Sequence, residues 1–204
     1  MGVAGAPETA ISGGELAALA SDPGRRPEGL EGGLAASADF DMSKRNTYPF
    51  GAHVAVVEVD TETGQARLVR HVAVDDCGRI LNPLLVDGQV HGGVAQGAAQ
   101  ALLEEVVYDE GGNPLTASLA SYEMPGPADL PSFETAHPET PTTLNPLGAK
   151  GIGEAATVGS TPAVQSAVID AVAHLGVTHV DMPLSPERVW RAIRQASRAS
   201  GASR

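Results

Sequence analysis

The sequence predicts an α+β protein in which a mixed sheet, built from hairpins, packs against helices. Two β-rich runs flank a short turn that ends in glycine, which is the pattern of a β-hairpin. Segments with helical spacing of apolar residues follow, in the middle and at the end of the chain. Because these helices and strands do not alternate strictly, a parallel βαβ architecture is disfavoured.

Composition restricts the classes of function. The 204 residues suffice for one domain or a compact pair of lobes, and only 3% are aromatic, so Val, Ala, Leu and Ile must form the core. A formal charge of −12 argues against binding to nucleic acid or an anionic membrane surface. The single cysteine, Cys77, excludes an intramolecular disulfide. Without a membrane-spanning apolar run or a secretory signal, a cytoplasmic protein is expected.

Three regions are expected. Residues 1–46 form a partly irregular N-terminal segment, in which Glu15–Ala20 could make a short helix. Residues 47–196 form the folded domain, and residues 197–204 form a flexible tail.

The hairpin comprises strands at His53–Asp60 and Gln65–Val74, joined by a turn at Thr61–Gly64. If side chains alternate strictly between the two faces of the second strand, one face carries Leu68, Arg70, Val72 and Val74.

A glycine-rich helix is predicted next, with Asp87 as its N-cap and its end near Glu105. Each glycine inside a helix costs about 1 kcal/mol relative to alanine, so close approach of another backbone is the expected compensation. The glycines are Gly88, Gly92, Gly93 and Gly97; the amide-rich face carries Gln89, Gly93, Gln96 and Gln100, and the core face carries Val90, Val94 and Ala101.

The remaining segments are less regular. Strands are predicted within 106–117 and 177–183, separated by a long irregular segment at 123–146. A helix is expected to begin at Thr161 and Pro162 and to end at Gly176, and a final helix should follow within 185–193.

The stretch Gly151-Ile152-Gly153-Glu154 matches the start of a dinucleotide-binding loop, but no strand precedes it, so that interpretation is disfavoured. Its glycines could make a tight turn before a helix or an anion site. Glu154 could be an acid at a helix N-terminus or a general base in a desolvated pocket. Lys150 could be an exposed charge or a neighbour of an anionic cofactor.

Other chemistries lack support. Cys77 is expected to be a buried thiol, because no activating partner is evident in the sequence. The histidines do not show the spacing of zinc ligands, and neither a nucleophile elbow nor a phosphate-binding loop occurs.

The stretches "VDDCGRILNPLLVDGQVHGGVAQGAAQALLEE" and "NPLGAKGIGEAATVGSTPAV", followed by "THVDMPLSPERVW", resemble the C-terminal part of the molybdopterin-binding large subunit of molybdenum hydroxylases. This family includes xanthine dehydrogenase and aldehyde oxidase, and the sequence of these motifs is most similar to the aerobic carbon monoxide dehydrogenase branch. The resemblance runs from about residue 48 to residue 193, and more weakly back to about residue 29. It implies that the fold is the second of two lobes that hold the cofactor.

The resemblance also implies a cofactor and site residues. The cofactor would be molybdenum–molybdopterin, in the cytosine dinucleotide form, and no protein side chain is assigned as a metal ligand. Glu154 corresponds to the base beside molybdenum, and Gln89 to an amide that contacts the cofactor. The residues implied to lie beside the pterin are Lys150, Gly151, Ile152 and Gly153.

The resemblance also implies partner subunits, because parts of the family's cofactor site are not found in this sequence. Members of the family are several times longer, and neither the first lobe nor the loop with a copper-bound cysteine is found here. The resemblance therefore implies a partner chain that supplies the first lobe, iron–sulfur and FAD subunits, and a small-molecule substrate. The alternative is a non-catalytic remnant that acts as an interaction or scaffold module.

Overall fold

The computed structural model describes residues 1–29, 34–35, 37–39 and 46–202. The chain divides into two compact units, Met1–Lys44 and Arg45–Arg204. In the first unit, a 3-10 helix η1 (Pro7–Thr9) precedes helix α1 (Gly13–Ser21), which confirms the short helix expected there. Ser12 and Glu15 form a reciprocal capping box that satisfies two backbone N–H groups at the start of α1.

The second unit contains a sheet of three strands with the order β1-β2-β3. Strands β1 (Phe50–Val59) and β2 (Ala66–Asp76) form the predicted antiparallel hairpin, and β3 (Phe133–Ala136) pairs with β2 in parallel. Gly64 closes the hairpin turn with φ of +79°, and a β-carbon there would collide with the backbone of Pro186. The turn therefore requires glycine both for its backbone conformation and for close packing.

A β-bulge in the hairpin corrects the predicted alternation of β2. Val56 pairs with Arg70 and Val57 pairs with Leu68, so Val69 is an extra residue on β2. Leu68 faces the core as expected, but beyond the bulge the inward positions become His71, Ala73 and Asp75, while Arg70 is exposed and Val72 and Val74 are only partly buried. One inserted residue moves every following side chain to the opposite face.

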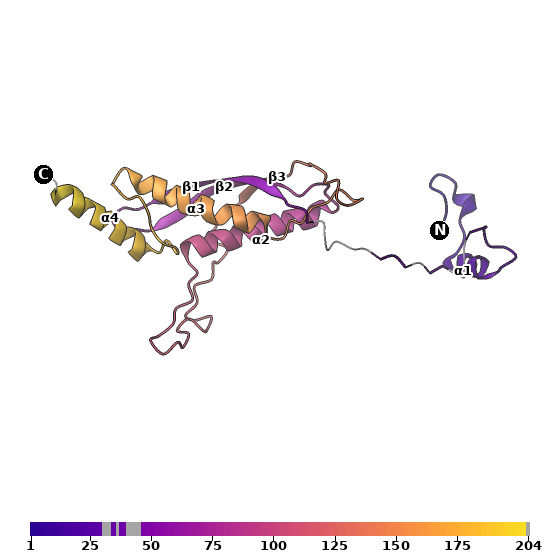
Figure 1. The fold of residues 1–204 in the computed structure, drawn as a ribbon, viewed down its shortest axis with the longest axis horizontal. Coiled ribbons are helices and arrows are strands. Elements are labelled where there is room, and N and C mark those ends of the chain that lie inside the picture. The colour runs from indigo at the N-terminus through magenta and orange to yellow at the C-terminus, as the bar shows by residue number, and fades with distance from the viewer. Residues whose placement is uncertain (30–33, 36, 40–45, 203–204) are drawn as a thin grey trace. The chain divides into compact units, whose positions relative to one another are not determined.

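Two long helices lie side by side against the sheet (Figure 1), α2 (Pro83–Leu102) near β2 and β3, and α3 (Ala155–Ala173) mainly against β1. Helix α4 (Pro186–Ala202) packs Val189 and Ile193 into the same core. The arrangement confirms the α+β class. The buried centre is aliphatic, as the composition required, and includes Leu68, Ala98, Ala101, Val164, Val168, Val172, Leu184 and Val189.

The helix boundaries differ from the prediction. Helix α2 begins at Pro83 with Asn82 as its cap, so Asp87 lies inside the helix. Helix α3 begins at Ala155, and Pro162 lies in its interior instead of at its first position. Proline has no N–H to donate to the carbonyl of Val158, so one helical hydrogen bond is lost at a residue that is 72% exposed.

The predicted strands in 106–117 and 177–183 are absent from the described residues; the first region forms a turn with one bridge, Tyr108 to Pro114. Strand β3 instead lies within the segment expected to be irregular. Helix α4 extends through most of the expected tail, residues 203–204 of which lie outside the described part of the chain. Among the helices of the described residues, none is both long enough and apolar enough to cross a membrane.

Candidate functional site

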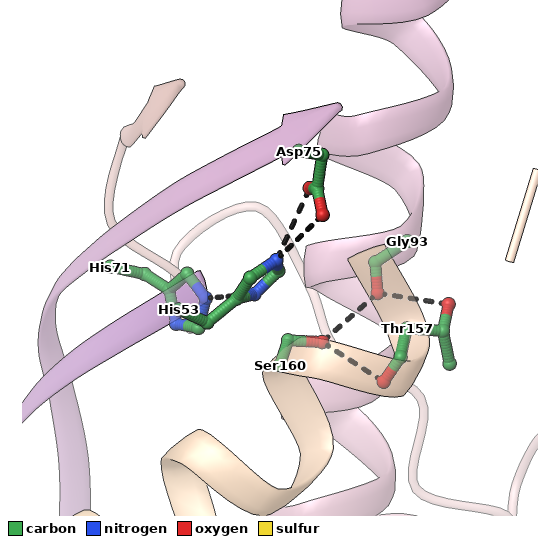
Figure 2. A network of polar contacts seen from close by, with 6 residues as sticks. All are labelled: His53, His71, Asp75, Gly93, Thr157 and Ser160. Carbon is green, nitrogen blue, oxygen red and sulfur yellow. Dashed lines mark hydrogen bonds and ion pairs between the residues drawn. The ribbon is translucent and has the colours of Figure 1, made fainter. Parts of the chain in front are cut away.

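Helices α2 and α3 approach closely at Gly93. A β-carbon on Gly93 would lie 2.8 Å from the β-carbon of Ala156 and 3.0 Å from the backbone nitrogen of Thr157. The hydroxyl groups of Thr157 and Ser160 both donate to the Gly93 carbonyl, at 3.2 and 3.3 Å (Figure 2). Close approach, the expected compensation for glycine, is thus found at Gly93 and also at Gly97, where a β-carbon would collide with Ser160.

The same compensation does not apply to Gly88 and Gly92. A β-carbon at either position would meet no heavy atom within 4 Å. Of the four glycines of α2, only Gly93 and Gly97 therefore lie in the contact with α3.

This contact brings two predicted site segments together. Gln89 lies one helical turn before Gly93, and Gly153 precedes the start of α3. A β-carbon on Gly153 would lie 3.4 Å from Oε1 of Gln89, so the amide reaches the glycine loop. Gln89, Gly153 and Glu154 are all exposed on this chain.

Lys150 is held in place and is not the exposed charge that one interpretation expected. Its Nζ lies 3.1 Å from Oδ1 of Asp76, with both side chains almost fully buried, and 4.5 Å from the centre of the Phe50 ring. Its backbone N–H donates to the carbonyl of Cys77 at 2.7 Å. Burial would raise the pKa of Asp76, but polar contacts with Thr140, Gly78 and Lys150 lower it overall.

Cys77 is a free, buried thiol, as predicted. Burial raises the pKa of this thiol above its ordinary value, which disfavours the reactive thiolate.

The candidate residues line two neighbouring cavities. Gln89, Lys150 and Ile152 contribute to a cavity of about 190 Å³, together with Cys77. Glu154 lines a separate cavity of about 340 Å³. Gly151 is exposed, and a β-carbon there would meet no heavy atom within 4 Å.

Glu154 is the N-cap residue of α3, and its side chain makes no capping hydrogen bond. Glu154 therefore lies at a helix N-terminus, as one of the two interpretations expected. Its carboxylate is exposed on this chain, so the desolvation that a buried general base needs is not supplied by the described residues.

The glycine loop presents a set of free donors. In the described part of the chain, no hydrogen bond engages the backbone N–H groups of Gly151, Ile152, Gly153 or Glu154. Unengaged N–H groups before a helix favour an anion, and the Gln89 amide adds polar contacts beside them. These residues fit an anionic, hydrogen-bonding ligand. The described residues contain no cluster of His, Cys, Asp and Glu suited to bind a metal ion directly.

One group of polar side chains was missed by the sequence analysis, which considered the histidines only as possible zinc ligands. His53 Nε2 lies 3.1 Å from Oδ2 of Asp75, and His53 Nδ1 lies 3.1 Å from Nε2 of His71. All three side chains are buried and point toward one another (Figure 2), and His53 and Asp75 also line the cavity of about 340 Å³. Without the bulge at Val69, regular pairing would place His53 on the opposite face from His71 and Asp75, so the hairpin pattern alone could not identify the group.

Comparison with known proteins gives consistent matches. The family model for the molybdopterin cofactor-binding domain matches residues 3–131. The carbon monoxide dehydrogenase large chain of Hydrogenophaga pseudoflava is 43% identical over 169 residues, which are 83% of this chain and 21% of that protein. The nicotine 6-hydroxylase large subunit of Paenarthrobacter nicotinovorans is 38% identical over 193 residues, or 94% of this chain and 24% of that subunit.

Solved structures agree with these sequence matches. CO dehydrogenase from Oligotropha carboxidovorans superposes with a TM-score of 0.83 and 39% identity, over 97% of this chain and 24% of that chain. Quinoline 2-oxidoreductase from Pseudomonas putida 86 superposes with a TM-score of 0.80 and 39% identity, over 95% of this chain and 25% of that chain. The present chain thus spans about a fifth to a quarter of the length of these relatives.

Proposed function

Because this chain belongs to the molybdopterin cofactor-binding domain family, we propose that it is the C-terminal cofactor-binding portion of a molybdenum hydroxylase, with Glu154 as the base. The observation that carries the proposal is the meeting of Gln89 with Gly153, directly before Glu154. The sequence motifs that resemble the family come from two distant segments, and the packing of α2 on α3 puts them next to each other.

The residues have distinct proposed roles. The Gln89 amide and the free N–H groups of Gly151, Ile152 and Gly153 would hold the polar edge and phosphates of molybdopterin, in its cytosine dinucleotide form. Lys150 would add positive charge beside that anion, although Asp76 already offsets part of it. When bound, the cofactor would supply the two-electron oxidation of a small-molecule substrate. Glu154 would accept the proton that the reaction releases.

Exposed apolar side chains support the need for a partner chain. Leu81, just before α2, and Leu84 and Leu85 in its first turn are 60%, 80% and 65% exposed, and Leu81 and Leu85 line the same cavity as Gln89. Phe50 and Val158 line the Glu154 cavity and are 56% and 72% exposed. Apolar groups gathered around a polar site indicate a surface that another protein covers.

We infer that this partner supplies the first lobe of the cofactor site. By covering the site, the partner would also desolvate Glu154. Iron–sulfur and FAD subunits would complete the assembly and accept the electrons. A reducing compartment, the cytoplasm, suits its single free cysteine.

The test is co-expression of the chain with a candidate first-lobe chain, followed by purification and analysis of molybdenum and pterin. The proposal expects a complex that carries both. A stable complex without molybdenum or pterin would instead support the scaffold interpretation and reject cofactor binding.

The role of Glu154 requires a second comparison. Glu154→Gln should retain molybdenum and pterin but lose turnover, because the amide cannot accept the proton. Glu110→Gln is the matched control, since Glu110 is an exposed loop residue outside both cavities. Turnover at the wild-type rate in Glu154→Gln would end the proposed role.

A further inference from the structure

Three buried titratable side chains form a hydrogen-bonded network that has no role in the proposed function. Asp75 contacts His53, with Nε2 of the imidazole 3.3 and 3.1 Å from the two carboxylate oxygens. On its other side, His53 Nδ1 lies 3.1 Å from Nε2 of His71 (Figure 2). The side chains of His53 and Asp75 are each only 2% exposed, and His71 is completely buried.

The hydrogen-bond partners assign one tautomer to each ring. In the arrangement that satisfies them, His53 carries its proton on Nε2 and donates it to the Asp75 carboxylate. His53 Nδ1 is then an acceptor, and the donor to it is the Nε2–H of His71. Burial, together with the nearby His53, lowers the pKa of His71 to about 4, although Asp75 opposes this shift. His71 is therefore neutral at pH 7 and holds His53 in one tautomer.

The pair of Asp75 and His53 opens onto the same cavity as Glu154. This cavity of about 340 Å³ is lined by all three residues, and its size admits several water molecules. Two glycines allow the backbone to pack closely against the pair. A β-carbon on Gly159 would lie 2.7 Å from the His53 ring, and one on Gly51 would collide with an Asp75 oxygen. His53 also borders an open groove of about 980 Å³ between β1 and α3, which provides an opening to bulk water.

We propose that the pair of Asp75 and His53 takes up the proton that Glu154 has accepted, and that His71 is a positioning residue for this transfer. The inference rests on the proposed function, in which Glu154 acts as a base. In the transfer, the O–H bond of protonated Glu154 breaks and its electron pair restores the carboxylate. The proton crosses the cavity through water and forms an O–H bond on Asp75. No oxidant or reductant is needed.

Other charged groups surround the pair. Asp170 of α3 lines the open groove together with His53. Asp76 follows Asp75 in β2 and forms an ion pair with Lys150. The Lys150 ammonium group lies over the ring of Phe50, which lines the Glu154 cavity. From α2, His91 contacts Phe133, whose ring also contacts His71. None of these titratable groups is among the residues that line the cavity shared by Asp75 and Glu154.

The first test uses the full 204-residue chain without cofactor, labelled with ¹⁵N and ¹³C, and reads the ring nitrogens of histidine and the carboxyl carbon of Asp75 by NMR. At pH 7, His53 and His71 should both carry their proton on Nε2. A proton on Nδ1 of His53 would overturn the proposal, because the ring could not then bridge Asp75 and His71.

Coupling across the cavity is tested with Glu154→Gln in the same chain. Loss of the negative charge should move the Asp75 carboxyl and His53 ring signals, whereas the exposed control Glu110→Gln should leave both in place. Equal spectra for Glu154→Gln and the wild type would overturn the inference. This readout does not require molybdenum, so it can fail while the proposed function stands, and it can succeed if the cofactor does not bind.

The second test uses the assembled, molybdenum-containing complex. Asp75→Asn keeps the shape of the side chain but cannot take up a proton, so kcat should fall about tenfold or more with little change in KM. The solvent deuterium isotope effect on kcat should increase, since proton transfer becomes slower. An unchanged kcat with an unchanged isotope effect would overturn the proposal. If this variant fails to assemble, the NMR comparison of wild type with Glu154→Gln still decides the question.

Discussion

Gly153 and Gln89 meet at the tip of the contact between two helices, where a β-carbon on Gly153 would lie 3.4 Å from Gln89 Oε1. The relationship depends on Gly93, whose carbonyl accepts the hydroxyl hydrogens of Thr157 and Ser160. Fixing α2 against α3 at that point fixes the distance between the amide and the glycine loop. The candidate site is thus a consequence of helix packing.

The packing predicts opposite effects for two adjacent glycines. Gly93→Ala forces a methyl group against Ala156 and the backbone of Thr157, so the free energy of unfolding should fall by about 1–3 kcal/mol. Gly92→Ala meets open space and should be neutral or stabilising by up to about 1 kcal/mol. Urea unfolding followed by circular dichroism measures both. Similar losses for the two variants would contradict the helix contact.

The buried ion pair predicts a large cost for losing its cation. Lys150→Met would leave the Asp76 carboxylate buried without its partner and should lower the free energy of unfolding by about 3–5 kcal/mol. The surface pair of Arg67 and Glu58 offers a matched control, because Arg67→Met should cost less than about 1 kcal/mol.

A second substitution separates charge from packing at this pair. Adding Asp76→Asn to Lys150→Met removes the uncompensated charge and should recover part of the lost stability. If the double variant is no more stable than Lys150→Met, burial of the carboxylate charge is not the cause of the loss.

His71 predicts a pH dependence of stability. Above pH 6.5, its ordinary pKa, the side chain is neutral in both the folded and the unfolded chain. Between pH 6.5 and about 4, only the unfolded chain binds a proton, so stability should fall as the pH falls, by up to about 3 kcal/mol. The stability associated with the lowered pKa of Asp76 is lost below its ordinary value of 3.8, in a separate window.

Urea unfolding at several values of pH between 7 and 4 measures this dependence. His71→Gln should flatten the curve in that range, and the control His174→Gln, at an exposed position, should keep the wild-type slope. A wild-type slope in His71→Gln would assign the dependence to other groups.

Cofactor retention provides the last prediction, which rests on the proposed function. Gln89→Ala removes an amide beside the glycine loop, and a lost hydrogen bond of about 1–1.5 kcal/mol corresponds to roughly tenfold weaker retention. Molybdenum content after extended dialysis of the assembled complex is the measurement. Gln195→Ala, on the exposed face of α4, should retain the metal as the wild type does.

Local patterns in the chain were sufficient for several elements. The hairpin was predicted because its turn and its alternating strands are contiguous in sequence. The core-facing valines of α2 were predicted because Val90 and Val94 repeat at helical spacing. Strand β3 was missed because its four residues are stabilised by pairing with β2, which lies far away in the chain.

The sequence alone predicted the amide-rich face and the glycine loop as candidates, and it determined the α+β class and the family resemblance. Tertiary structure decided that Lys150 is buried in an ion pair with Asp76, and that a single bulge at Val69 turns Asp75 toward His53. Such features depend on hydrogen-bond register and on contacts between distant segments, whereas sequence patterns report only the preferences of neighbouring residues. The physical reason is that register and close packing are set by the whole fold.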